Sequence, residues 1–253
     1  MLSIQHISKR FGGLQALRDV NIEADRACVT AVIGPNGAGK STLMNVISGF
    51  ILAENGSVVV DGQETVGQLP HRMCASGVAR TFQNLQMFSD MSTLEAVVTG
   101  RTRQRKASLF ANLLITPAVR REEKAAFDAA RELLISMGVP QSFWSRRAGD
   151  LPYGLQRRVE IARALATEPA YLLLDEPTAG LNDKESSALG EALLNLAKQG
   201  IGVVLIEHDI ELVMNISSSI FVMDAGTVIA RGTPAEVRKN PHVIAAYLGD
   251  ENE

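Results

Sequence analysis

Apolar and polar positions alternate along the first 24 residues, which is the pattern of strands that bury one face. The apolar positions lie on both sides of a turn at 11–13 and are Leu2, Ile4, Ile7, Val20, Ile22 and Ala24. A continuous apolar run at 29–33 then ends in a glycine-rich loop, and a helical pattern follows at 41–50. Two further strands are expected at 58–62 and 78–82. The first third of the chain therefore predicts antiparallel strands followed by a strand, a loop and a helix.

Further along, at about 92–166, apolar residues recur every three or four positions, most clearly at 120–137. This spacing predicts amphipathic helices. Strand-like runs return at 171–174 and 201–206, and the stretch 184–198 between them has a helical pattern. Strand, helix, strand is the order of a parallel βαβ unit. We therefore predict an α/β fold whose core is interrupted by an α-helical subdomain.

The composition of the chain mainly excludes other classes of protein. Hydrophobic residues make up 46% of the 253 residues and charged residues 21%, which excludes intrinsic disorder, collagen and coiled coil. The formal net charge of −3 provides no overall positive field for nucleic acid or an anionic membrane. Cys28 and Cys74 have no metal-ligand spacing, so we expect two buried thiols. Without a secretory signal or an apolar run of about 18 residues, we expect a cytosolic protein that reaches a membrane only through a partner.

The strongest local signal is a GxxxxGK[ST] motif between an apolar strand and a helix, Gly34-Pro35-Asn36-Gly37-Ala38-Gly39-Lys40-Ser41. Its glycines let successive backbone N–H groups face phosphate oxygens, and the helix N-terminus adds the positive end of its dipole. Lys40 is expected to reach the β- and γ-phosphates, Ser41 to bind Mg²⁺ and Thr42 to contact the α-phosphate. The motif predicts that a nucleotide with Mg²⁺ is bound by Asn36, Gly37, Ala38, Gly39, Lys40, Ser41 and Thr42.

Polar residues follow three later strands. The run 171–174 delivers Asp175 and Glu176 at its C-terminal end, where Asp175 would hold Mg²⁺ and Glu176 would orient or deprotonate the attacking water. The run 201–206 brings His208 to the same edge of the sheet, where it would sense the γ-phosphate. Gln83 lies where the helical region begins and is either a metal or water contact or an ordinary loop glutamine.

These motifs resemble the nucleotide-binding subunits of ABC transporters along essentially the whole chain. Within that superfamily the sequence is most similar to the branched-chain amino acid importer ATPases, through Arg80-Thr81-Phe82-Gln83, the insert around 109–121, the helix 157–163 and the ending 245–249. The resemblance implies a P-loop NTPase core, a mostly parallel sheet flanked by helices, with an antiparallel β subdomain and an inserted α-helical subdomain. It assigns 1–85 and 166–253 to the core and 86–165 to the helical subdomain.

The resemblance also implies roles for single residues. It assigns Phe11 to stacking on adenine, Gln83 to the Q-loop as a catalytic residue and metal ligand, His208 to the switch histidine, 179–182 to the D-loop, and Pro152, Tyr153 and Gly154 to the signature segment. It implies an ATPase that binds ATP and Mg²⁺ between the phosphate loop of one copy and the signature segment of another. The implied partners are a second ATPase subunit, transmembrane permease subunits and, indirectly, an extracytoplasmic solute-binding protein. The implied location is the cytoplasmic face of the inner membrane, with no nucleic-acid partner.

Two positions depart from the family signature. Pro152 stands where the family most often has Ser, and Leu155 where it has Gln or Glu, so the donors that reach the partner's γ-phosphate are missing. We expect this chain's own phosphate loop to be competent and the site that it completes in its partner to be weakened. A homodimer would contain that defect in both sites, and a heterodimer in one. The sequence leaves the choice between them open, together with the transported solute.

Other functions and partners are also compatible with the sequence. The rivals are a soluble ABC ATPase that acts on nucleic acid, the ATPase of a lipid or lipopolysaccharide export machine, and a regulatory partner with slow turnover. Basic clusters at 101–106, 120–121 and 146–147 either bind nucleic acid or form solvated helix faces. The apolar stretch 109–115 either docks a permease helix or packs inside the helical subdomain. The length of the insert favours the importer branch.

Overall fold

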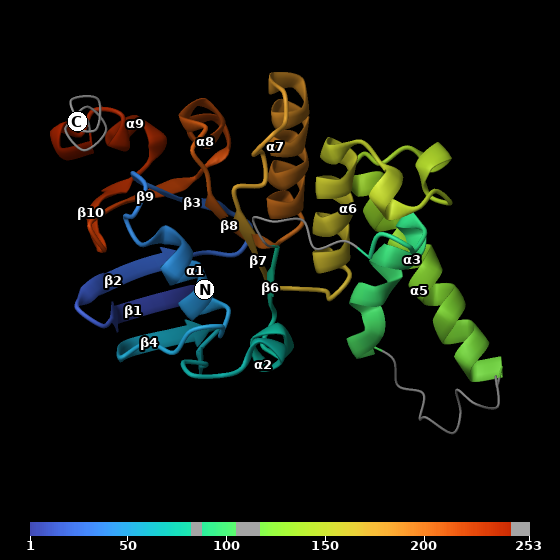
Figure 1. The fold of residues 1–253 in the computed structure, drawn as a ribbon, viewed down its shortest axis with the longest axis horizontal. Helices are drawn as coiled ribbons and strands as arrows, with labels where there is room; N and C mark the ends of the chain where they lie inside the picture. The colour runs from blue at the N-terminus through green and yellow to red at the C-terminus, as the bar shows by residue number, and fades with distance from the viewer. Residues whose placement is uncertain (82–87, 105–116, 244–253) are drawn as a thin grey trace. The chain divides into compact units, whose positions relative to one another are not determined.

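The computed structural model describes residues 1–81, 88–104 and 117–243, and these residues form two compact units. The first unit contains 1–81, 170–179 and 186–243, and the second contains 88–104, 117–169 and 180–185. All the named strands belong to the first unit, whereas the second is helical (Figure 1).

Two sheets form the framework of the first unit. The four-stranded antiparallel sheet has the order β2-β1-β4-β5, with β1 (Leu2–Phe11), β2 (Leu14–Ala24), β4 (Asn55–Val60) and β5 (Gln63–Glu64). The six-stranded sheet has the order β10-β9-β3-β8-β7-β6, with β3 (Val29–Ile33), β6 (Val78–Arg80), β7 (Tyr171–Asp175), β8 (Gly202–Ile206), β9 (Ser219–Asp224) and β10 (Thr227–Gly232). Its strands are parallel except for β10, which pairs antiparallel to β9. The parallel strands β3, β7 and β8 therefore end at one edge of the sheet.

Helix α1 (Lys40–Ile47) lies at the centre of the first unit. Its buried residues Leu43, Met44 and Ile47 share one hydrophobic cluster with side chains of β1, β2 and β4 and of the six-stranded sheet. The opposite face of the six-stranded sheet packs on α8 (Ile210–Ile216) and α9 (Pro234–Val237) in a second cluster. Helix α2 (Pro70–Ala75) lies between β5 and β6 in the chain, and α7 (Asp183–Lys198) lies between β7 and β8. The helix that starts at the glycine-rich loop is thus held by both sheets.

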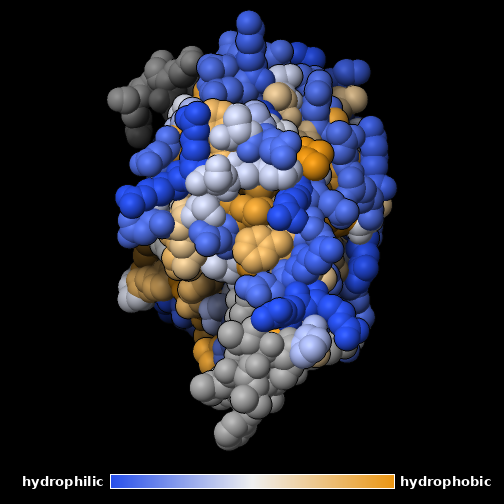
Figure 2. All heavy atoms as spheres, turned by 90° about the vertical axis from the view of Figure 1, so that its right-hand side faces the viewer, coloured by the Kyte–Doolittle hydropathy of each residue, from blue (hydrophilic) through white to orange (hydrophobic). Residues whose placement is uncertain are grey.

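The second unit consists of helices that pack on one another. They are α3 (Thr93–Val98), η1 (Thr99–Gln104), α5 (Pro117–Ser136), η2 (Gln141–Phe143), η3 (Ala148–Asp150) and α6 (Tyr153–Leu165). Helix α5 buries Ala126, Ala130 and Leu134, which are four residues apart and therefore lie on one face, as its apolar period predicts. The face of this unit in Figure 2 is mostly hydrophilic, with a small apolar group near its centre. No helix in the described ranges has the length and hydrophobicity that crossing a bilayer requires.

The predicted fold class is confirmed, but the hairpin formed by β9 and β10 was missed. The apolar run Ile220–Met223 supplies an ordinary strand signal. Its turn, however, contains Ala225 and Gly226, both with positive φ, of 43° and 80°. Two-residue hairpin turns of this kind favour Asn-Gly or Asp-Gly, and alanine rarely adopts positive φ. The turn therefore has the glycine but not the preceding Asn or Asp by which such hairpins are recognised in a sequence.

The two cysteines are free thiols, but they are less buried than predicted. Neither Cys28 nor Cys74 forms a disulfide, as predicted, but both side chains are partly exposed. Cys28 lies between a turn and β3, and Cys74 lies on the short helix α2. Both positions are at the boundary of the core, where a small side chain is covered on one side only.

A charged cluster connects the turn after β4 to β7. The Tyr171 hydroxyl donates to Asp61 Oδ1 at 2.8 Å, and the Arg26 guanidinium pairs with the other oxygen of Asp61. The Arg26 hydrogen bond holds the pKa of the Asp61 carboxyl far below its ordinary value of 3.8. Burial, aided by the hydrogen bond to Asp61, raises the pKa of Tyr171 to about 12. Ionised Asp61 therefore stabilises the folded state.

We expect Asp61→Asn to lower the free energy of unfolding at pH 7 by roughly 1 kcal/mol, because the charged pair is partly exposed and screened by water. A carboxyl whose pKa is depressed on folding stabilises above its unfolded pKa and loses that contribution as the pH falls. The deficit of the variant should therefore shrink below pH 3.8. Urea denaturation of the parent and the variant at pH 7 and pH 3 measures this difference in the free energy of unfolding. Asn tolerates the positive φ of 47° at this position, so backbone strain is unchanged. An equal deficit at both pH values would contradict the assignment to charge.

Candidate functional site

The glycine-rich loop between β3 and α1 approaches other backbone segments so closely that side chains are excluded. At Gly34, with φ of 150°, a Cβ would lie 2.0 Å from Met223 O. At Gly39, with φ of 96°, it would lie 2.5 Å from Ala16 O. Gly37 also has positive φ, of 81°, but a Cβ there would meet no atom within 4 Å. The loop thus needs Gly34 and Gly39 for close packing and Gly37 for conformation alone.

Lys40, at the start of α1, reaches back across this loop. Its Nζ donates to Gly34 O at 2.6 Å and to Pro35 O at 2.8 Å. The side chain is buried, and burial lowers the pKa of Lys40, while the nearby carboxylates Glu176 and Asp175 act in the opposite direction. The amine of Lys40 is therefore held by two carbonyl oxygens of the loop that precedes its helix.

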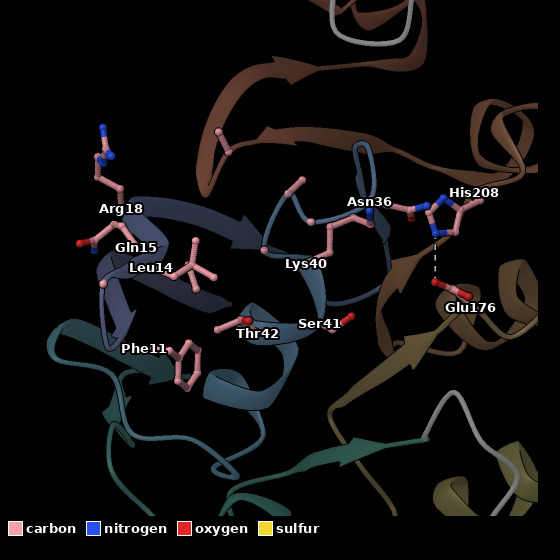
Figure 3. A pocket seen from close by; sticks show the side chains of 16 residues that line it. Phe11, Leu14, Gln15, Arg18, Asn36, Lys40, Ser41, Thr42, Glu176 and His208 are labelled. Atoms are coloured by element: carbon pink, nitrogen blue, oxygen red, sulfur yellow. Dashed lines mark hydrogen bonds and ion pairs between the residues drawn. The ribbon is translucent and has the colours of Figure 1, made fainter. Parts of the chain in front are cut away.

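A cavity of about 650 Å³ opens at this loop (Figure 3). Ten of the predicted residues line it: Phe11, Asn36, Gly37, Ala38, Gly39, Lys40, Ser41, Thr42, Glu176 and His208. Phe11 and Leu14 lie at one end, Glu176 and His208 at the other, and Lys40 lies between them. The other lining residues, which were not predicted, are Gly13, Leu14, Gln15, Ala16, Arg18 and Ala225. They come from the β1–β2 hairpin, the start of β2 and the β9–β10 turn, and only the fold brings them here.

Asp175, the last residue of β7, is buried and held from one side. Its Oδ2 accepts from Arg80 Nη2 at 3.1 Å, and Arg80 also donates to Asn45 Oδ1 at 2.7 Å and to Ser48 Oγ at 2.8 Å. Burial raises the pKa of Asp175, and the charge of Arg80 counteracts that rise. Oδ1 of Asp175 is buried and has no hydrogen-bond partner in the part of the chain that the structure describes. One carboxylate oxygen is thus fixed by Arg80, whereas Asp175 is not among the residues that line the cavity.

Glu176 and His208 are in direct contact. His208 Nε2 lies 3.0 Å from Glu176 Oε1, as the dashed line in Figure 3 marks. An ionised carboxylate only accepts hydrogen bonds, so this contact corresponds to a tautomer of His208 that carries its proton on Nε2. Glu176 has φ of 49°, an uncommon left-handed conformation for a residue other than glycine, and its N–H donates to Ile206 O at 2.9 Å. Such strained backbone positions cluster at functional sites.

The predicted signature segment, residues 152–154, belongs to the second unit. Pro152 is the N-cap of α6, and its side chain caps no N–H group. The ring of Tyr153 is partly exposed and lies over the Arg157 guanidinium at 5.4 Å. Gly154 is buried, and a Cβ there would lie 3.0 Å from Glu185 Oε1. Gln83, the expected Q-loop residue, lies outside the described residues, as does the apolar stretch 109–115.

The described arginines of the basic clusters in the second unit are exposed, except for Arg101, which is partly buried. Arg120, Arg121, Arg146 and Arg147 are exposed, and Arg146 lies against the Phe143 ring at 4.7 Å. Arg101 pairs with Glu168 at 3.0 Å. Exposed arginines are expected both of a solvated helix face and of a nucleic-acid contact, so the solvated helix face stays a prediction.

Comparison with known proteins gives a consistent result. Residues 17–179 match the family described as ABC transporter, and residues 227–253 match a family described as branched-chain amino acid ATP-binding cassette transporter. The chain belongs to the ABC transporter family and is one of its ATPases, as its motifs predicted.

Individual relatives are similar over nearly the full length. The sequence is 42% identical over 251 residues to BraF of Pseudomonas aeruginosa and to LivG of Escherichia coli, covering 99% of this chain and 98% of each relative. Both are named high-affinity branched-chain amino acid transport ATP-binding proteins. A solved structure described as the ADP conformation of an ABC transporter cassette is 33% identical, with a TM-score of 0.85 and 98% coverage of both chains. A nucleotide-free cassette is 32% identical, with a TM-score of 0.83 and 98% coverage of both chains.

We expect Gly39→Ala to destabilise the protein more than Gly37→Ala. Both variants place alanine at positive φ, which costs about 1 kcal/mol, but only the Cβ at residue 39 collides with a backbone oxygen, Ala16 O. At an overpacking cost of about 1–3 kcal/mol, the midpoint of thermal unfolding should be roughly 5 °C lower for Gly39→Ala. Calorimetry of the nucleotide-free proteins measures this difference. Equal midpoints would show that the close approach at Gly39 does not constrain the loop.

Proposed function

We propose that the chain is the ATP-binding and ATP-hydrolysing subunit of a membrane importer for branched-chain or related amino acids. The observation that carries this proposal is the 42% identity, over nearly the whole of both chains, to BraF and LivG. The match of residues 227–253 to the branched-chain cassette family supports the same class of solute. The cavity supports the ATPase part, because it combines a phosphate loop with a carboxylate and a histidine at one end.

In this proposal ATP occupies the cavity with adenine at Phe11 and its phosphates in the loop. The Phe11 ring is 45% exposed, which leaves a face for stacking. Lys40 exchanges the carbonyl oxygens of its loop for β- and γ-phosphate oxygens, and Thr42 contacts the α-phosphate. Phosphate oxygens also accept from the backbone N–H groups of Asn36, Gly37, Ala38 and Gly39. The nucleotide is therefore held by the loop and the start of α1 together.

The residues near the loop fit Mg²⁺. The proposed ligands are the Ser41 hydroxyl, Asp175 and Gln83, and oxygen atoms are what Mg²⁺ prefers. The buried Oδ1 of Asp175, without a hydrogen-bond partner in the described ranges, suits this role. Mg²⁺ usually keeps several water molecules and binds through one or two carboxylates together with substrate phosphates. When bound, Mg²⁺ would neutralise charge on the β- and γ-phosphates.

Hydrolysis in this proposal depends on positioning and electrostatics. Glu176 orients the attacking water and accepts its proton, and His208 turns its Nε2 proton from Glu176 toward the γ-phosphate. Gln83 is the third residue that this proposal places beside the γ-phosphate. Both Glu176 and His208 line the cavity at the end away from Phe11, which is the end where the γ-phosphate would lie.

The proposed assembly places the chain at the cytoplasmic face of the cell membrane. Its partners are a second ATPase subunit, transmembrane permease subunits and, through these, an extracytoplasmic solute-binding protein. The proposal keeps residues 1–85 and 166–253 as the ATP-binding core and 86–165 as the helical subdomain, although residues 166–169 and 180–185 group with the helical unit of the structure. Pro152, Tyr153 and Gly154 face the γ-phosphate of the second subunit.

We expect Glu176→Gln to bind ATP with parent affinity and to hydrolyse it at least about a hundredfold more slowly, because an amide does not accept the water's proton. Binding of a fluorescent ATP analogue and steady-state phosphate release measure the two effects. In cells that lack the gene, the parent should restore uptake of labelled leucine, isoleucine and valine, and Glu176→Gln should not.

The matched control is Glu191→Gln, which removes an exposed carboxylate from α7. It should behave as the parent in all three measurements. Hydrolysis by Glu176→Gln at the parent rate would contradict its role as the base. Normal uptake of all three amino acids in the deletion strain would contradict the importer assignment and leave the ATPase assignment intact.

We expect Pro152→Ser to stabilise the protein and to raise kcat if the active form is a homodimer. Leu155 N and Gln156 N already donate to Pro152 O at 2.9 and 3.0 Å, so the helix start is formed and lacks only a side-chain cap. A serine hydroxyl caps such an N-terminus with about 1 kcal/mol and can also donate to a partner's phosphate. Pro152→Ala, which lacks the hydroxyl, is the control. If Ser and Ala variants have the kcat of the parent, the missing hydroxyl does not weaken the signature.

A further inference from the structure

Glu207 is a buried carboxylate that accepts three hydrogen bonds. Its Oε1 accepts from Thr178 N at 2.8 Å and from Thr178 Oγ at 2.7 Å, and its Oε2 accepts from His208 N at 3.1 Å. Glu207 is 3% exposed and Thr178 is 7% exposed. An unpaired buried carboxylate would be strongly unfavourable, so these donors account for its presence here.

These contacts close a ring around the catalytic pair. Thr178 lies two residues after Glu176, and Glu207 directly precedes His208. Thr178 donates hydrogen bonds to Glu207. The ring closes at the next residue, His208, whose Nε2 lies 3.0 Å from Glu176 Oε1. The position of His208 relative to Glu176 is therefore coupled to the hydrogen bonds of Glu207.

The backbone of Glu176 needs such support. Its φ of 49° is disfavoured for a side-chain-bearing residue and persists only where the surroundings fix it. The β7–β8 ladder supplies one constraint, because Glu176 N donates to Ile206 O at 2.9 Å. The Thr178–Glu207 contacts supply a second, on the other side of Pro177.

We propose that Glu207 is a positioning residue of the ATPase reaction, which fixes Glu176 and His208 relative to each other by clamping the turn after β7 to the end of β8. The proposal rests on the ATPase function proposed above. Glu207 does not line the cavity and touches neither nucleotide nor water in this scheme. It acts through the backbone of Thr178 and His208.

A carboxylate is specifically required for this clamp. Two backbone N–H groups, of Thr178 and His208, are served by two different oxygens of Glu207. Glutamine has one acceptor oxygen, and its NH₂ group only donates. Glu207→Gln therefore keeps the shape of the side chain but leaves one backbone N–H facing a donor. Thr178→Val is milder, since it removes the hydroxyl bond and keeps the N–H bond.

The experiment measures kcat, ATP affinity and the backbone amide signals of these variants in the full chain, with kcat measured in the assembly in which the parent is active. We expect Glu207→Gln to lower kcat roughly ten- to a hundredfold with ATP affinity changed less than about twofold, because misplacement of about 1 Å has effects of this size. Thr178→Val should lower kcat less and in the same direction. Selective ¹⁵N labelling of the four histidines should show the His208 amide proton shifted upfield in Glu207→Gln without nucleotide.

The chain offers a matched control. Glu236 also accepts from the N–H and the hydroxyl of a threonine, Thr233, at 2.7 and 2.9 Å, but at the exposed start of α9. Glu236→Gln makes the same substitution in a comparable threonine contact away from the cavity and should leave kcat unchanged. An equal loss of kcat in Glu236→Gln and Glu207→Gln would mean that both act through general destabilisation and would overturn the proposal.

The remaining outcomes are also decisive. If the parent hydrolyses ATP and Glu207→Gln has the same kcat, the clamp does not position the catalytic pair and the inference is wrong. If the parent does not hydrolyse ATP in any assembly, the proposed function fails, while the His208 amide shift still tests the clamp. If Glu207→Gln does not fold, Thr178→Val carries the test, and an unchanged kcat there overturns the proposal.

Discussion

The site depends on the close approach of three backbone segments at the phosphate loop. Gly34 lies against Met223 O of β9, and Gly39 lies against Ala16 O of β2. The β9–β10 turn joins them, because Gly226 N donates to Ala38 O at 3.2 Å and its own carbonyl accepts from Arg18 N at 2.8 Å. The loop is therefore shaped by strands of both sheets before any phosphate is bound. Such preorganisation lets binding free energy go into contacts with the nucleotide, because the loop does not have to be ordered first.

Two buried carboxylates at the ends of neighbouring strands fix the backbone near Glu176 and His208, as the glycines fix the phosphate loop. Asp175 is held by Arg80, which is itself fixed by Asn45 of α1, and Glu207 is held by Thr178 and the His208 amide. Buried ionic groups add little net stability, because desolvation offsets most of the attraction. Removing one partner, however, leaves a buried charge uncompensated and is strongly unfavourable. These contacts therefore select one arrangement of the strand ends more than they strengthen the fold.

The sequence predicted those parts of the site that are local in the chain. The phosphate loop is one continuous motif with its strand and helix, and Asp175, Glu176 and His208 directly follow apolar strands, so period and spacing were sufficient. Arg80 and Glu207 were not assigned roles, because their partners are 95 and 29 residues away, respectively, and no spacing rule connects them. The cavity residues Gln15, Arg18 and Ala225 were missed for the same reason. Long-range pairing of side chains follows from tertiary packing, which a single sequence expresses only weakly.

The contacts of Lys40 show how a preorganised loop can gain free energy when phosphate binds. Its amine is buried and donates to two neutral carbonyl oxygens, Gly34 O and Pro35 O. In the proposed complex the same donors meet phosphate oxygens, and hydrogen bonds between two charged groups are stronger than those to a neutral acceptor. On binding, the amine would exchange two neutral carbonyl oxygens for charged phosphate oxygens, and the side chain would stay buried and ordered. Burial lowers the pKa of Lys40, whereas the carboxylates Glu176 and Asp175 raise it. The same low-dielectric setting strengthens the attraction of the charged amine to phosphate.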